Sequence, residues 1–181
     1  ATLVLSILIV SFVIYWKFGR QEYRGPRSEI QVLMSRAPKV GAKLSEFTAK
    51  NINGGTYRFG PSSKFRVVNF WASWCNPCME ELPSLSKFVY DRRDRVEVVA
   101  VSNDKNENDI RVVLKAYPQL NLESVHVIYD SEKTLYDLFE VKGLPESFIV
   151  SPDGTLLRKI VGAISWDSAE AAAYFESVLG K

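Results

Sequence analysis

The only two cysteines of the chain, Cys75 and Cys78, stand three positions apart. They follow residues 65–70, a run rich in β-branched and aromatic side chains that is typical of a buried strand. A helical pattern begins at the cysteines, and residues i and i+3 are neighbours on the first turn of a helix. The two sulfur atoms could therefore form and reopen a disulfide with little backbone movement. This spacing indicates redox chemistry at a strand-to-helix turn.

Placement on the helix distinguishes the two thiols. A thiolate is the nucleophile of thiol–disulfide exchange, and the free amides of a helix N-terminus favour negative charge. We therefore expect Cys75 to have a pKa below that of an ordinary cysteine and to be exposed. Cys78 lies one turn further on, on the face that carries Leu82 and Leu85, and should be shielded. The pattern predicts an attacking thiol, Cys75, and a resolving thiol, Cys78.

Three other interpretations of the cysteines stay open at this point. A structural disulfide would close so short a loop that it would constrain the unfolded chain very little. A zinc site would need two further ligands, and the chain offers no other cysteine and a single histidine, His126. Two buried, inert thiols are the third alternative. Redox activity is favoured over all three, because a Trp-Cys-x-Pro-Cys helix start is an unusual place to bury inert thiols.

The composition sets the class of protein. A chain of 181 residues with 46% hydrophobic and 24% charged residues has room for one domain of ordinary size and an appendage. The net charge of +2 is too small to indicate nucleic-acid binding. We therefore expect no nucleic-acid partner.

The first 16 residues carry no charge and are almost wholly apolar. A membrane-spanning helix needs about 20 such residues, so we expect residues 1–18 to be a membrane anchor that is truncated upstream. Tyr15 and Trp16, followed by Lys17 and Arg20, fit an interface belt. A cleaved signal peptide is one alternative, but no small-residue cleavage site follows the apolar run. A core helix is the other, but it would normally carry a polar face. The missing upstream flank prevents the positive-inside rule from giving the orientation.

Residues 19–37 are polar, charged and broken by Gly25-Pro26, which predicts a tether. Residues 38–181 then form the folded domain. Patterning within it predicts strands over 47–51, 56–59, 65–70, 96–101, 125–129, 147–150 and 155–161. It predicts helices over 75–90 (kinked at Pro83), 110–117, 131–139 and 167–179, and a solvated loop over 103–109.

This element order predicts an α/β fold with a central mixed sheet, helices on both faces and an N-terminal hairpin around Asn53-Gly54-Gly55. Pro152-Asp153-Gly154 predicts a second hairpin, and Asp167 with Glu170 has capping-box spacing. The cysteines fall at the carboxyl end of a central strand, which is where open α/β sheets place their functional sites.

Two motifs together carry a family resemblance. Trp74-Cys75-Asn76-Pro77-Cys78, with the run 143–148 (Gly-Leu-Pro-Glu-Ser-Phe) downstream, resembles the membrane-anchored TlpA/ResA/CcmG-like thioredoxins over residues 38–181. The resemblance implies a thioredoxin-like fold and a dithiol that reduces selected disulfides on the periplasmic or outer side of the cytoplasmic membrane. It also implies an apocytochrome c client during cytochrome c maturation, an electron donor of the DsbD/CcdA type, and no organic cofactor or metal.

The same resemblance assigns the catalytic positions residue by residue. Cys75 corresponds to the nucleophile and Cys78 to the resolving thiol. Glu81 corresponds to a glutamate that tunes the thiol pKa values or relays a proton, and its spacing places it one turn beyond Cys78. The alternative for Glu81 is a solvated helix carboxylate, as Glu80 exemplifies. Pro145 corresponds to the cis-proline that faces the disulfide.

Six positions are expected to bind the client: Trp74, Asn76, Pro77, Leu144, Pro145 and Glu146. Trp74 would shield the thiols and offer a contact surface, while Trp71 fits a core role at least as well. Glu146 would line the client groove, and a plain surface charge is its alternative.

Two rival functions remain compatible with the sequence. A net oxidase or isomerase would use the same dithiol, because direction depends on reduction potential relative to the compartment. A copper carrier would use the two thiols as soft ligands for copper(I). Such carriers usually add a histidine and space their cysteines more widely, so the reductant is the favoured reading.

Overall fold

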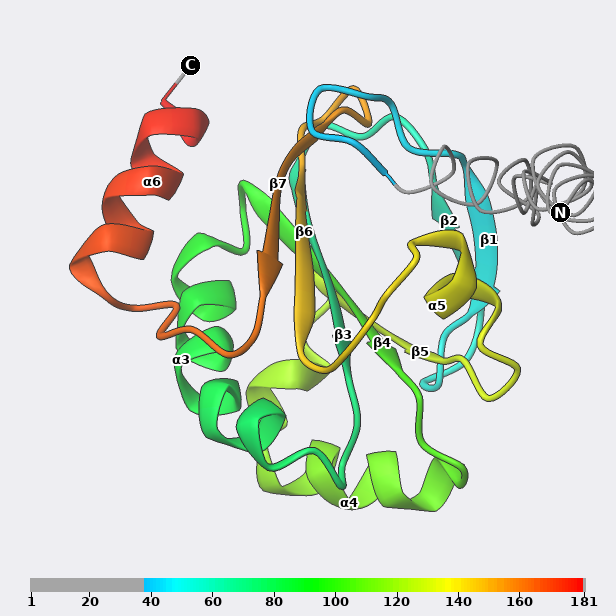
Figure 1. Ribbon diagram of the computed structural model, residues 1–181. Coiled ribbons are helices and arrows are strands. Elements are labelled where there is room, and N and C mark those ends of the chain that lie inside the picture. Colours follow the sequence, from blue (N-terminus) through cyan, green and yellow to red (C-terminus); the bar gives the residue numbers. More distant parts are fainter. Residues whose placement is uncertain (1–37, 181) are drawn as a thin grey trace, which may run out of the picture. The chain divides into compact units, whose positions relative to one another are not determined.

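The computed structural model describes residues 38–180. Its centre is a five-stranded mixed sheet in the order β5-β4-β3-β6-β7 (Figure 1). Strands β3, β4 and β5 pair in parallel, β6 pairs antiparallel with β3, and β7 pairs antiparallel with β6. The strands are β3 (Phe65–Trp71), β4 (Val96–Ser102), β5 (Val125–Tyr129), β6 (Glu146–Val150) and β7 (Leu156–Val161). The predicted mixed sheet is therefore confirmed.

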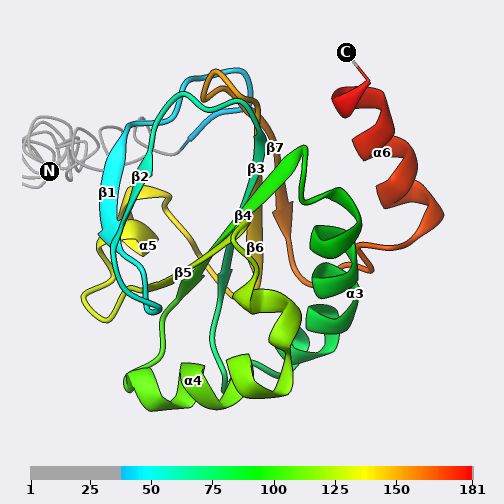
Figure 2. The same ribbon diagram turned by 180° about the vertical axis from the view of Figure 1, so that it is seen from behind.

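Helices cover both faces of this sheet. One face packs against α3 (Asn76–Arg92), α4 (Glu107–Ala116), the 3-10 turn η1 (Pro118–Asn121) and α6 (Ala169–Leu179). The other face carries α5 (Thr134–Leu138) and the antiparallel hairpin of β1 (Phe47–Lys50) and β2 (Thr56–Phe59), as Figures 1 and 2 show from opposite sides. The predicted N-terminal hairpin of this domain is confirmed.

Strand β3 joins the two halves of the core. Successive side chains of a strand point to opposite faces, so Val67 and Trp71 pack beneath α3 and α6, whereas Val68 and Phe70 pack beneath α5 and the hairpin. Burial on both faces explains why β3 reads as a continuous apolar run, as strands covered on both sides do. The site that follows β3 therefore stands at the end of a strand that is buried on both faces.

Two helix starts differ from the prediction, and at each one a side chain outside the apolar pattern accepts hydrogen bonds from backbone N–H groups of the first turn. Helix α4 begins at Glu107, since the Asn106 side chain accepts a hydrogen bond from the N–H of Asn108. Helix α5 begins only at Thr134, and the carboxylate of Asp130 accepts from the N–H groups of Leu135 and Tyr136. The solvated loop predicted over 103–109 is thus too long, and the helix predicted over 131–139 is also too long.

The capping box predicted for the last helix is wrong. Ser168 caps α6, and its hydroxyl accepts from the N–H of Ala171 over 3.2 Å. The Asp167 carboxylate instead accepts from the hydroxyl of Ser165 over 2.8 Å. Asp167 therefore belongs to the turn before α6 and does not cap the helix.

No helix within residues 38–180 is long and apolar enough to cross a membrane. The anchor predicted over 1–18 and the tether predicted over 19–37 lie outside the described residues.

Candidate active site

Cys75 is the N-cap residue of α3, at the turn that follows β3. Its N–H donates to the carbonyl of Ala72 over 3.1 Å, which closes the turn. Cys75 and Cys78 form a disulfide with their Cα atoms 5.2 Å apart, and the N–H of Cys78 donates to the Sγ of Cys75 over 3.3 Å. Pro77 stands in the first turn, where its missing N–H has no helical partner. The Cys75 sulfur thus receives one of the free amides of the helix start.

The two sulfur-bearing residues are both buried in this oxidised state. Cys78 is 1% exposed, as predicted, but Cys75 is only 6% exposed, and the prediction of an exposed Cys75 is wrong. Its Sγ is bonded to a partner one helical turn inside the protein, which draws the side chain inward. Cys75 nevertheless lines a surface hollow of about 420 Å³, so a client can approach it.

Most of the predicted client-binding residues surround this hollow. Its other lining residues are Trp74, Asn76, Pro77, Tyr136, Gly143 and Leu144. Trp74 is 62% exposed, an unusual position for so large an apolar side chain. The Leu144–Pro145 peptide bond is cis, as the resemblance implies, although Pro145 itself is buried.

Tyr136 is a lining residue that sequence reasoning missed. It comes from α5, far along the chain from the cysteines, and its backbone N–H donates to the Asp130 carboxylate over 2.9 Å. Burial, reinforced by the carboxylates of Glu146 and Asp137, raises the pKa of the Tyr136 hydroxyl. No local sequence signal indicates this placement, because it depends on how α5 packs against the sheet.

Glu81 is buried, with 4% of its surface exposed, whereas its neighbour Glu80 is exposed. The amide of Asn69 donates to Oε1 over 3.0 Å, and the N–H of Ile164 donates to Oε2 over 3.1 Å. Asn69 also donates to the hydroxyl of Ser147 over 2.9 Å. Burial raises the pKa of Glu81 although the two hydrogen bonds oppose the shift. The reading of Glu81 as a solvated carboxylate is therefore wrong.

Glu146 is buried, so the surface charge that is the alternative interpretation of this residue is wrong. Its side chain is 1% exposed and does not line the hollow. Its Oε1 accepts from the N–H of Lys142 over 3.1 Å, and Oε2 pairs with the Nζ of Lys159 at 2.8 Å. The β6–β7 pairing sets Lys159 opposite Phe148, two residues along from Glu146, and side chains two apart share a sheet face. Glu146 therefore ties the 142–145 segment to the sheet from beneath.

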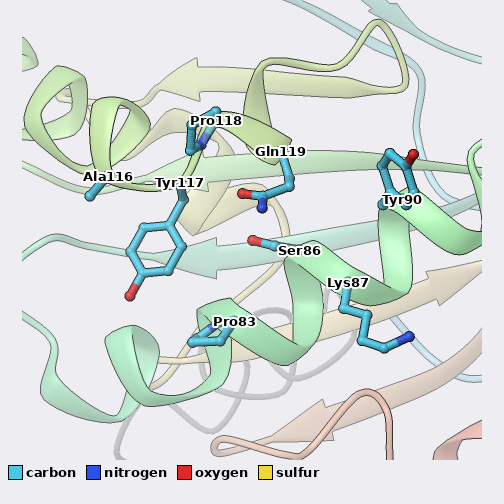
Figure 3. A pocket seen from close by; sticks show the side chains of 8 residues that line it. All are labelled: Pro83, Ser86, Lys87, Tyr90, Ala116, Tyr117, Pro118 and Gln119. Carbon is cyan, nitrogen blue, oxygen red and sulfur yellow. The ribbon is translucent and has the colours of Figure 1, made fainter.

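A second hollow, of about 480 Å³, lies away from the cysteines between α3 and the segment that joins α4 to η1 (Figure 3). Its lining residues are Pro83, Ser86, Lys87, Tyr90, Ala116, Tyr117, Pro118 and Gln119. Neither cysteine lines this second hollow. Size alone therefore does not mark the active site, whereas the disulfide does.

No metal site is visible among residues 38–180, where no group of three His, Cys, Asp or Glu side chains could hold an ion. His126, the histidine considered for a zinc site, lies beside Glu97 with Nε2 3.5 Å from Oε2 and packs on the ring of Tyr57. Contacts with His126, Arg66 and Ser62 outweigh the effect of burial and lower the pKa of Glu97. The contacts of His126 are thus with Glu97 and Tyr57, as expected of a histidine with a structural role.

Comparison with known proteins identifies the family. A family model described as thioredoxin-like matches residues 63–156, just over half of the chain. The chain belongs to the thioredoxin-like family. Among its thioredoxin-like relatives, the thiol-disulfide oxidoreductase ResA of Oceanobacillus iheyensis is 29% identical over 173 residues, which are 93% of this chain and 81% of that protein. ResA of Bacillus subtilis is 24% identical over 127 residues, 69% of each chain.

Solved structures of thioredoxin-like proteins agree. A crystal structure from Chlorobium tepidum, assigned as a thiol:disulfide interchange protein DsbE, superposes with a TM-score of 0.70 and 26% identity. It covers 80% of this chain and is itself covered completely. This thioredoxin-like protein, with its Cys75–Cys78 pair, is a ResA/CcmG-like thiol:disulfide oxidoreductase whose clients are disulfide-containing proteins.

Proposed function

We propose that this oxidoreductase reduces the disulfides of selected client proteins on the extracytoplasmic side of the cytoplasmic membrane. The observation that carries the proposal is the contact between the Cys78 N–H and the Cys75 Sγ at the edge of the hollow. After reduction of the disulfide, this amide and the helix N-terminus would stabilise a thiolate on Cys75. Cys75 is thus the thiol suited to attack, and buried Cys78 is the thiol suited to resolve.

The reaction proceeds by two exchanges. The Cys75 thiolate attacks one sulfur of the client disulfide, a Cys75–client bond forms, and the second client sulfur leaves as a thiolate that takes up a proton. The Cys78 thiolate then attacks the Sγ of Cys75, which expels the first client sulfur as a thiolate and forms the Cys75–Cys78 disulfide. Two electrons pass to the client, and the protein ends oxidised.

Glu81 is the group that takes the proton from Cys78. It stands one turn beyond that cysteine on α3, and residues three apart on a helix are neighbours. Its burial keeps the pKa of Glu81 above the usual value of 4.5, closer to neutral pH, where a carboxyl group exchanges protons efficiently. Asn69 fixes the carboxylate by its hydrogen bond to Oε1.

The client dock is the surface around the hollow. Trp74, Asn76, Pro77 and Leu144 offer exposed or half-buried contact area beside Cys75. Following the resemblance to the TlpA/ResA/CcmG-like proteins, the client is apocytochrome c with its haem-binding cysteines oxidised. A membrane thiol reductase of the DsbD/CcdA type restores the dithiol, and residues 1–18 anchor the chain as a single span. The protein would thus act in cytochrome c maturation, with no organic cofactor or metal.

Trapping tests this proposal. Cys78→Ala leaves no resolving thiol, so the reduced full chain mixed with oxidised apocytochrome c should accumulate a disulfide between Cys75 and the client. Cys75→Ala is the matched control and should trap nothing. Trapping of a model peptide disulfide but not of apocytochrome c would refute the client while retaining the chemistry. Trapping by Cys75→Ala, through Cys78, would refute the assignment of the two thiols.

A further inference from the structure

Asp104 is a buried carboxylate that is hydrogen-bonded to the turn leading to the disulfide and that the reaction above does not use. It stands two residues beyond the end of β4, in the segment that the sequence predicts as a solvated loop, and yet only 1% of it is exposed. The adjacent backbone is bound to the site as well, because the N–H of Asn103 donates to the carbonyl of Trp71 over 3.0 Å. This part of the chain therefore packs against the turn that leads to Cys75.

The contacts of Asp104 fix both of its carboxylate oxygens. The N–H of Ser73 lies 3.2 Å from Oδ1 and 3.0 Å from Oδ2, and the Ser73 hydroxyl lies 2.6 Å from Oδ1. The Ser102 hydroxyl lies 2.6 Å from Oδ2 and itself accepts from the N–H of Asp104. Within the described residues, every group bonded to the carboxylate is thus a neutral donor. Neutral N–H and O–H donors stabilise a charged carboxylate, but they bring no positive charge to neutralise it.

The charge is held against the turn that carries the nucleophile. Ser73 is the second residue of the turn that the Cys75 N–H closes on Ala72, and Cys75 follows two residues later. A carboxylate in a poorly solvated setting disfavours a second negative charge nearby. Of the other titratable residues of the site, Cys78 is the disulfide partner of Cys75, Tyr136 on α5 lines the same hollow, and Glu81 lies one turn beyond Cys78 on α3.

We propose that Asp104 is a positioning residue that places a fixed negative charge behind the Ala72–Cys75 turn and so limits thiolate formation on Cys75. The helix N-terminus and the Cys78 amide favour the thiolate, and Asp104 opposes them. Suppressing the thiolate makes the disulfide less oxidising, because a stabilised thiolate is what makes a dithiol pair a strong oxidant. This effect of Asp104 acts on thiol–disulfide exchange itself and does not depend on which client is reduced.

The test compares two variants of the same contact in the full, reduced chain. Asp104→Asn removes the charge and keeps an oxygen acceptor for Ser73, whereas Ser73→Ala loosens the contact and keeps the charge. The readout is the pKa of the Cys75 thiol, taken from thiolate absorbance against pH. Asp104→Asn should lower it by about half a unit or more, a roughly threefold higher thiolate-to-thiol ratio. Ser73→Ala should not lower it.

Glu107→Gln, which changes an exposed carboxylate paired with Arg111, is the control for net charge and should leave the pKa unchanged. If Asp104→Asn fails to fold, Asp104→Ser must shift the pKa in the same downward direction. An unchanged or raised pKa in the neutral Asp104 variants would overturn the proposal. An equal fall in Ser73→Ala would overturn it too, since loosening of the turn would then account for the effect.

Discussion

The amide of Asn69, on β3, donates to Glu81 Oε1 on α3 over 3.0 Å, and both residues are buried. This bond joins the strand that leads to the cysteines to the helix that starts with them. Glu81 Oε2 accepts from the N–H of Ile164, in the segment between β7 and α6. One carboxyl group thus links three segments of the fold, so its protonation state matters for stability.

Glu81 should make the stability of the protein depend on pH. Burial raises the pKa of this carboxyl above 4.5, so the folded protein holds the proton more tightly than the unfolded chain does. The stability that Glu81 contributes is therefore complete below about pH 4.5 and is lost as the pH rises through the raised pKa. Urea unfolding of the oxidised protein and of Glu81→Gln should show the wild type becoming less stable relative to the variant as the pH rises from below 4.5 towards neutral.

The control for that experiment is Glu80→Gln, on the exposed face of α3. Its unfolding free energy should differ from that of the wild type by less than about 0.5 kcal/mol. A pH-independent difference for Glu81→Gln would contradict a raised pKa at this site.

The Glu146–Lys159 pair should behave as a buried ion pair. Lys159→Met would leave the Glu146 carboxylate buried without its cation, at a cost of about 2–4 kcal/mol in unfolding free energy. Glu146→Gln in addition should recover much of this loss, because glutamine can still accept from the N–H of Lys142. Urea unfolding of the single and double variants measures the coupling.

Lys43→Met is the comparison for an exposed pair, since Lys43 lies 3.5 Å from Asp153 with both side chains largely in solvent. It should cost less than about 1 kcal/mol. A double variant as unstable as Lys159→Met alone would show that charge pairing is not what Lys159 contributes.

Trp74 should contribute to client binding and not to folding. Its indole is 62% exposed at the hollow, so Trp74→Ala should change the unfolding free energy by less than about 0.5 kcal/mol. Loss of an exposed aromatic anchor should raise KM for a client protein about tenfold, which corresponds to about 1.4 kcal/mol of binding. Steady-state reduction of a protein disulfide gives both constants.

Val161→Ala removes a similarly exposed apolar side chain from β7, outside the lining of the hollow. It should leave KM unchanged. Equal effects of the two substitutions, or a loss of stability in Trp74→Ala, would contradict a docking role for Trp74.

The sequence predicts features whose causes are local. The Cys75–Cys78 pair at a helix start and the hairpin around Pro152-Asp153-Gly154 depend on neighbours a few positions away, and both are present. The cis bond before Pro145 needed the family resemblance, because nothing in its neighbours distinguishes cis from trans. Cys75 was predicted to be exposed since helix position alone takes no account of the disulfide.

Residues whose setting depends on distant partners were missed or misread. Asp104 is buried because it bonds to Ser73, 31 positions earlier, and Glu146 is buried because Lys159 reaches it across the β6–β7 pair. Polar residues in such places look like loop or surface residues when only their neighbours are considered. Burial of a polar group requires a partner, and the partner is known only once the chain is folded.

The direction of electron transfer is the central claim, and the reduction potential of the Cys75–Cys78 couple tests it most directly. The measurement equilibrates the full chain with a thiol–disulfide buffer of known potential and follows the fraction oxidised. A reductant of client disulfides requires a value well below that of the oxidant DsbA, which is about −120 mV. We expect such a low value. A potential near −120 mV would contradict the account and would make the protein a net oxidase.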